Sequence, residues 1–133
     1  MQIVVFSLKD AFYAFRTEQI EEISKIRPVS RMPDAEPWIE GLVNLRGEII
    51  VLANLEKLLG KEPSNDYNSF IIVKHGDAKV GILVKEVKEV TEIDVSRIEK
   101  LSDGDSGKVS GLIQMGDRIV NYLDIADLMD KRG

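Results

Sequence analysis

The residues best suited to recognise another molecule lie in the stretch GLVNLRGEII, residues 41–50. Arg46 and Gly47 separate two short apolar runs, as the turn of a β-hairpin would, and Asn44 precedes them. An arginine carries a planar fork of donors that matches a carboxylate or a backbone carbonyl of a partner. The chemistry that this stretch suggests is recognition, although a solvated turn arginine is an equally good interpretation of the residues alone.

Patterns for catalysis and metal binding fail on inspection. The sequence has no cysteine and no GxSxG, and its one histidine, His75, falls in a predicted turn where we expect it to be solvated. The loop SDGDSGKVS, residues 102–110, lacks a calcium pattern because Gly107 and Lys108 occupy positions that need an oxygen ligand and a glycine. It lacks a phosphate-loop pattern because Ser102 replaces a required glycine. We therefore expect no enzyme activity, no catalytic residue, no cofactor and no metal.

Composition narrows the class of protein further. The chain has 133 residues, a net charge of −5 and a pI of about 5.0, and it carries few aromatic residues. This disfavours a nucleic-acid binder, although small barrels often bind oligonucleotides. A small enzyme or purine-binding protein would need a polar pocket, and no glycine-rich phosphate loop supports it. The N-terminus lacks a signal-peptide pattern and no apolar run is long enough to span a bilayer, so we expect a cytoplasmic protein without membrane insertion.

The strands and turns that would position these residues can be predicted from an internal repeat in the sequence. The stretch IVVFSLKDAFYAFRTEQIEEI, residues 3–23, aligns without gaps on FIIVKHGDAKVGILVKEVKEV, residues 70–90. The stretch GLVNLRGEIIVLANLEKLLG, residues 41–60, aligns in the same way on GLIQMGDRIVNYLDIADLMD, residues 111–130. Coincidental β-patterning is the alternative, but two blocks in the same order favour two copies of one unit.

Each copy is predicted to contain five short strands and one helical turn. The opening strands are expected at Gln2 to Leu8 and Phe12 to Arg16 in the first copy, and at Ser69 to Lys74 and Lys79 to Val84 in the second. A third strand begins near Ile20 or Val87, and a hairpin follows. Asn54 and Asp124 are the expected N-caps of the helical turns, and Gly60 is the expected C-cap.

This pattern predicts a mainly β fold of two small closed barrels that pack together, with short helices. We expect one domain, 1–133, with a first subdomain of about 10–66 plus part of the N-terminal strand and a second of about 67–133. The first strand is apolar on both faces. Ile3 and Val5 lie on one face, and Val4, Phe6 and Leu8 lie on the other. One of these faces should fill a barrel, and the other should meet the sister barrel or a partner.

On these residues the chain resembles the CheW family of bacterial chemotaxis adaptors over essentially its whole length. The stretches that carry the resemblance are GLVNLRGEII, VVFSLKDAFYAF, VGILVKEVKEV and GLIQMGDRIVNYLDIADLM. The resemblance implies two packed five-stranded SH3-like barrels. It also implies a non-catalytic adaptor that joins the cytoplasmic tips of methyl-accepting chemoreceptors to the regulatory domain of the histidine kinase CheA, in extended arrays. A scaffold in a related receptor–kinase pathway, for motility or gene control, is the alternative.

The resemblance also implies two sets of contact residues. The receptor-binding set is Arg46, Asn44, Ile20, Ile23 and Glu22, and the kinase-binding set is Gly41, Leu42, Val87 and Val90. Plainer roles remain open: the isoleucines could belong to a barrel core, and Gly41 could be needed only for backbone conformation. The chain departs from the family pattern at Val51, Asn54 and Glu56, where Pro, Asp and Arg are common, and Glu56 is expected to make that edge less basic. We expect the free protein to be a monomer.

Overall fold

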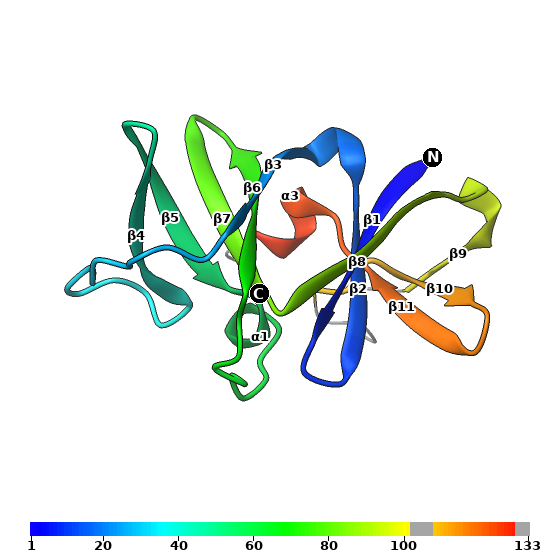
Figure 1. Ribbon diagram of the computed structural model, residues 1–133. Coiled ribbons are helices and arrows are strands. Elements are labelled where there is room, and N and C mark those ends of the chain that lie inside the picture. The colour runs from blue at the N-terminus through cyan, green and yellow to red at the C-terminus, as the bar shows by residue number, and fades with distance from the viewer. Residues whose placement is uncertain (102–107, 130–133) are drawn as a thin grey trace.

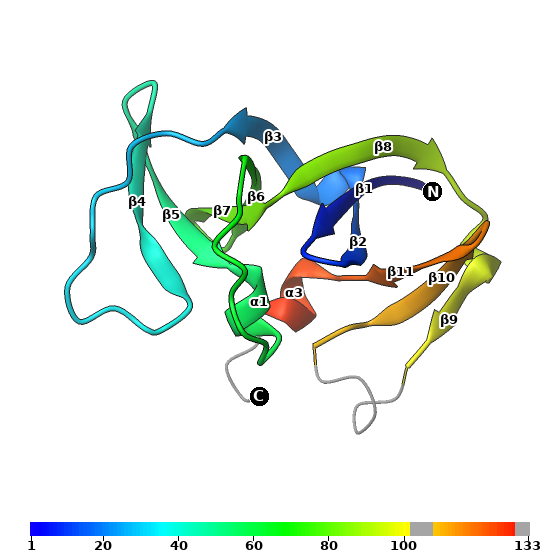
Figure 2. The same ribbon diagram turned by 60° about the horizontal axis from the view of Figure 1, so that its bottom comes forward.

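The computed structural model describes residues 1–101 and 108–129, and it is a mainly β protein whose two sheets lie beside each other (Figure 1, Figure 2). Residues 102–107, whose loop the sequence excludes as a calcium or phosphate site, and residues 130–133 lie outside this description. The predicted class, a mainly β fold of two packed units with short helices, is confirmed.

The strands are β1 (Gln2–Leu8), β2 (Ala11–Arg16), β3 (Ile20–Lys25), β4 (Ile39–Leu45), β5 (Glu48–Asn54), β6 (Ser69–His75), β7 (Ala78–Val84), β8 (Glu86–Glu92), β9 (Ile98–Lys100), β10 (Gly111–Met115) and β11 (Arg118–Tyr122). The short helices are η1 (Thr17–Gln19), α1 (Leu55–Leu58), η2 (Val95–Arg97) and α3 (Ile125–Leu128). The expected N-caps are found, because Asn54 accepts from the amide of Lys57, and Asp124 accepts from the amides of Ala126 and Asp127.

Each sheet combines strands from both halves of the chain. The six-stranded sheet has the order β8-β1-β2-β11-β10-β9, and the five-stranded sheet has the order β3-β6-β7-β5-β4. After each opening hairpin the third strand crosses over: β3 leaves β2 to pair with β6, and β8 leaves β7 to pair with β1. The sheets therefore do not follow the predicted subdomain bounds of 10–66 and 67–133. The alignment of a repeat shows that two segments are alike, but it does not show which strands pair with each other in a sheet.

The core has three parts, and β1 contributes to two of them. Ile3 and Val5 belong to the core of the six-stranded unit, whereas Phe6 and Leu8 belong to a central core that also includes residues of the five-stranded sheet. Both faces of β1 are thus covered, as expected for a strand that is apolar on both sides, and Val4 is also buried. In the central core the ring of Phe6 stacks on Phe15 at a centroid distance of 5.4 Å. Burial of this apolar surface packs the two units against each other.

The duplication is visible in detail. In the second copy β9 pairs with β10, and in the first copy the same place holds a single bridge between Ser30 and Leu42. Gly41 and Gly111 recur at these places, and each lies close to the neighbouring segment. A Cβ atom added at Gly41 would lie 2.4 Å from the Ser30 oxygen, and one added at Gly111 would lie 2.8 Å from Ile98 Cγ2. Both copies thus use a glycine where a neighbouring segment passes over the hairpin.

Candidate interaction surfaces

Arg46 occupies the turn between β4 and β5 in a conformation unusual for its residue type. Arg46 and Gly47 have φ angles of 53° and 86°, the combination that two-residue hairpins favour because it matches the twist of the strands. The side-chain oxygen of Asn44 accepts from the Gly47 amide at 3.0 Å, which holds the turn in place. Asn44 therefore shapes the turn that presents Arg46.

The Arg46 guanidinium forms an ion pair with Glu22 of β3. Because β3 and β4 are the two edge strands of the five-stranded sheet, this pair links one edge strand to the turn that follows the other. The hydrogen bond to Glu22, followed by the charges of Glu22 and Glu48, raises the pKa of Arg46 above its ordinary value. The Arg46 side chain nevertheless remains 65% exposed, so its unused donors can meet a partner.

Two lysines pair with further carboxylates at the same end of the barrel. Lys79 lies 2.9 Å from Glu21 and 2.8 Å from Glu48, and Lys74 lies 3.4 Å from Glu21. The bond to Lys79, with a smaller one to Lys74, lowers the pKa of Glu21, and the bonds to Glu48 and Glu21 raise the pKa of Lys79. The acidic residues around Ile20 thus face paired cations and do not form a purely negative surface.

The two isoleucines of the predicted receptor-binding set have different environments. Ile20 is half-buried against the central core, which favours the plainer role of packing. Ile23 is 41% exposed on β3, so it can serve as an apolar anchor on the strand that carries Glu22, although its register opposite Ile71 turns it to the other face of the sheet from Glu22. Arg46, Asn44, Glu22 and Ile23 thus belong to one sheet, while Ile20 packs against the central core.

One apolar residue on this surface was missed. Ile49 is exposed on β5 and lies opposite Asn44 in the hairpin register. The alternation of β5 could have identified it, because Ile50 and Leu52 fill the barrel core and Ile49 must then point the other way.

The predicted kinase-binding set is divided between the two sheets. Gly41 is buried and Leu42 is half-buried on β4, and the backbone of Leu42 exchanges two hydrogen bonds with Ser30. On β8, Val87 is half-buried against the central core, whereas Val90 is exposed. Leu42 and Val90 are available to a partner, while Gly41 and Val87 support the fold.

A hollow on the six-stranded unit begins on β8, and the sequence did not single it out. It is lined by Lys88 and Glu89 of β8, Arg97 of η2, and the β10–β11 hairpin with Asp117 and Arg118. Arg97 donates to the Gln114 carbonyl at 2.7 Å, and the Arg118 guanidinium stacks over the Phe12 ring at 4.1 Å. The hollow therefore presents charges of both signs, as the surface around Arg46 does.

Glu56 has a different role from the one expected. It is buried, and one of its carboxylate oxygens accepts from the Ser64 amide, the Ser64 hydroxyl and the Tyr67 hydroxyl at 3.0, 3.0 and 2.8 Å. Its charge therefore holds the linker 60–68 against α1 and does not make an exposed edge less basic. The amide of Asn54 completes this cluster by donating to Tyr67 and Glu40.

Across residues 1–101 and 108–129 no group of three or more His, Cys, Asp or Glu is arranged to hold a metal ion. In the same part of the chain no helix has the length and apolar character needed to cross a membrane.

Comparisons with known proteins agree with this geometry. The model of the CheW-like domain matches residues 2–133. The chain is 29% identical to the chemotaxis protein CheW of Thermotoga maritima, over 98% of this chain and 88% of that protein. It is 28% identical to CheW of Bacillus subtilis, over 98% and 87%. The crystal structure of the scaffolding protein TtCheW from Thermoanaerobacter tengcongensis superposes with a TM-score of 0.87 at 31% identity, covering 99% of this chain and 89% of that one.

Proposed function

Because this chain belongs to the CheW-like domain family, we propose that it is a non-catalytic chemotaxis adaptor that couples chemoreceptor cytoplasmic tips to the regulatory domain of the histidine kinase CheA. The observation that supports the proposal is that exposed residues of the predicted contact sets lie on both packed sheets. Arg46 and Ile23 belong to the five-stranded sheet, and Val90 belongs to the six-stranded sheet. Two surfaces are the minimum that an adaptor needs.

The receptor-contact surface is proposed to consist of Arg46, Glu22 and Ile23, with Asn44 as the residue that holds the turn. Ile23 supplies the apolar anchor and Arg46 supplies donors for a carboxylate or carbonyl of the receptor tip. Ile20 belongs to the support beneath this surface. The kinase contacts are proposed to be Val90 on the six-stranded sheet and Leu42 on the five-stranded sheet, with Val87 and Gly41 as support.

The adaptor is proposed to act in the cytoplasm, as a monomer when free, and to join membrane-associated receptor arrays without inserting into the bilayer. Individual contacts can be weak in such an array, because many of them act together.

Calorimetric binding of the CheA regulatory domain and of a receptor-tip fragment, both encoded in the same genome, tests the proposal. Wild type should bind both partners. Arg46→Ala should bind the receptor fragment at least about tenfold more weakly, as an interface anchor does, and should bind the kinase domain as wild type does.

Arg31→Ala is the matched control, because Arg31 is an exposed arginine away from this surface. Circular dichroism should show that both variants are folded. If wild type binds neither partner, the adaptor function is wrong. If Arg46→Ala binds the receptor fragment as tightly as Arg31→Ala does, the assignment of Arg46 is wrong.

A further inference from the structure

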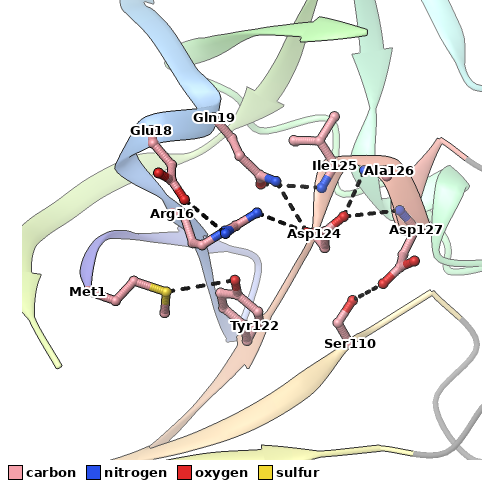
Figure 3. A network of polar contacts seen from close by, with 10 residues as sticks. All are labelled: Met1, Arg16, Glu18, Gln19, Ser110, Tyr122, Asp124, Ile125, Ala126 and Asp127. Carbon is pink, nitrogen blue, oxygen red and sulfur yellow. Dashed lines mark hydrogen bonds and ion pairs between the residues drawn. The ribbon is translucent and has the colours of Figure 1, made fainter. Parts of the chain in front are cut away.

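A polar network joins the crossover between the two sheets to the last helix (Figure 3). Arg16 ends β2, η1 follows it, and β3 begins directly after Gln19. Asp124 lies in the middle of the network: one of its oxygens accepts from Gln19 Nε2 at 3.2 Å and pairs with Arg16 Nη2 at 3.4 Å. The Gln19 side-chain oxygen accepts in turn from the amide of Ile125 at 3.3 Å. Gln19 is thus held twice by the N-terminus of α3.

Asp124 performs two tasks with its two oxygens. Its Oδ1 accepts from the amides of Ala126 and Asp127, at 2.9 and 3.4 Å, and caps α3. Its Oδ2 is left for the crossover. The equivalent residue of the first copy, Asn54, caps α1 in the same way but gives its amide to Glu40 and Tyr67 of its own surroundings. The link between cap and crossover therefore exists only in the second copy.

The network connects helix α3 to the start of strand β3, whose position affects the surface around Arg46. Ile125 and Leu128 of α3 are buried in the central core, so the helix cannot shift freely. Strand β3 carries Glu22 and Ile23, and Glu22 holds the Arg46 guanidinium. A chain of contacts thus runs from α3 through Gln19 to β3 and on to Arg46. The bonds are partly buried, where a hydrogen bond restrains geometry more than it does at an open surface.

We propose that Gln19, held by Asp124, is a positioning residue that sets the start of β3 and thereby the placement of Glu22, Ile23 and Arg46 for the receptor tip. This inference rests on the proposed adaptor function, because it assigns a purpose to the position of β3. It also implies that Asp124, a residue of the second copy, helps to position a surface that lies on the five-stranded sheet.

Gln19→Ala removes both contacts with α3 and leaves β3 intact. We expect receptor-tip binding to weaken about fivefold, while CheA-domain binding stays unchanged, because only the receptor surface depends on β3. Hydrogen exchange of the free protein should be faster at the amides of residues 20–25. Thr17→Ala is the matched control within η1, since Thr17 contacts Gln2 and not Asp124.

Exchanging the amide and carboxylate side chains between positions 19 and 124 distinguishes a positioning role from a general loss of stability. Gln19→Glu alone places a second carboxylate beside Asp124 and should weaken receptor binding more than Gln19→Ala does. Adding Asp124→Asn restores a donor–acceptor pair, keeps a good N-cap residue, and offers Arg16 the new carboxylate. The double variant should recover receptor binding to within about twofold of wild type, a recovery that a general loss of stability would not show.

The inference is overturned if Gln19→Ala binds the receptor fragment as wild type does, or if CheA-domain binding falls equally. Failure of the adaptor function itself looks different, because wild type would then bind no receptor fragment. In that case hydrogen exchange in the free protein still tests the positioning role, and unchanged exchange at residues 20–25 overturns it.

Discussion

Substitution of Gly41 by alanine tests whether this glycine is a structural residue. A Cβ atom at this position would lie 2.4 Å from the Ser30 carbonyl oxygen and 2.6 Å from Val29 Cγ1, and the φ angle is +150°. The oxygen belongs to the backbone, so it cannot turn aside as the end of a side chain could. The segment would have to move away, which would break the two hydrogen bonds of 2.8 and 2.9 Å between Ser30 and Leu42.

The expected loss is large for one methyl group. Overpacking costs roughly 1–3 kcal/mol, and a strained backbone conformation adds about 1–3 kcal/mol. We expect a total near 4 kcal/mol, out of the roughly 5–15 kcal/mol by which domains are stable. With a urea slope of about 2 kcal/mol/M, the midpoint of unfolding should fall by about 2 M.

Gly47→Ala is the matched control, because its φ angle is +86° but no atom lies within 4 Å of the added Cβ. It should lose only the backbone contribution, about 1–2 kcal/mol. Urea unfolding followed by circular dichroism measures both variants. If Gly41→Ala is no less stable than Gly47→Ala, close approach of the Ser30 segment does not explain this glycine, and a direct contact with the kinase becomes the better explanation.

Three further predictions use the same assays. Asn54→Ala removes the cap of α1 and the amide that donates to its neighbours, so the free energy of unfolding should fall by about 2–3 kcal/mol in urea, and an unchanged value would contradict the buried cluster. The pKa of Glu21 is lowered from its ordinary 4.5, chiefly by Lys79, so its stabilisation is complete above that value and is lost as the pH falls through the lower folded pKa. On acidification the free energy of unfolding should therefore fall more for wild type than for Glu21→Gln, and this difference should be smaller in high salt. If the free energies of unfolding of the two proteins fall in parallel with pH, the prediction is wrong. In receptor binding, Arg46→Ala and Glu22→Ala should be non-additive, because each removes the same ion pair, whereas additive losses would show that the two residues act separately.

Local structure could be predicted from the sequence because local chemistry determines it. The β-branched run of β1, the glycine-containing turn at Arg46 and the caps at Asn54 and Asp124 each depend on neighbouring residues, and each was found where expected. Burial of both faces of β1 could also be predicted, because a strand that is apolar on both faces must be covered on both.

Pairing across the chain could not be predicted in the same way. The sequence of β3 shows a strand, but it does not tell whether β2 or β6 lies beside it. The candidate site shares this limit: Arg46 was recognisable as an unusual turn residue, whereas its partner Glu22 became clear only when β3 and β4 formed the edges of one sheet. Ile20 and Ile23 differ in burial because of their surroundings in space, and their sequence pattern is the same.

The exchange of strands between halves has a consequence for synthesis on the ribosome. β1 pairs with β8, and Ser7 meets Glu86 across a separation of 79 residues. At about 5–20 residues per second, β1 waits roughly 4–16 s before its neighbour is made. During that time the β1–β2 hairpin exposes apolar residues on both faces and an unpaired edge, which is the kind of segment that aggregates. Neither half can complete a sheet alone, so the first hairpin of a nascent chain has no sheet to join until the second copy has emerged.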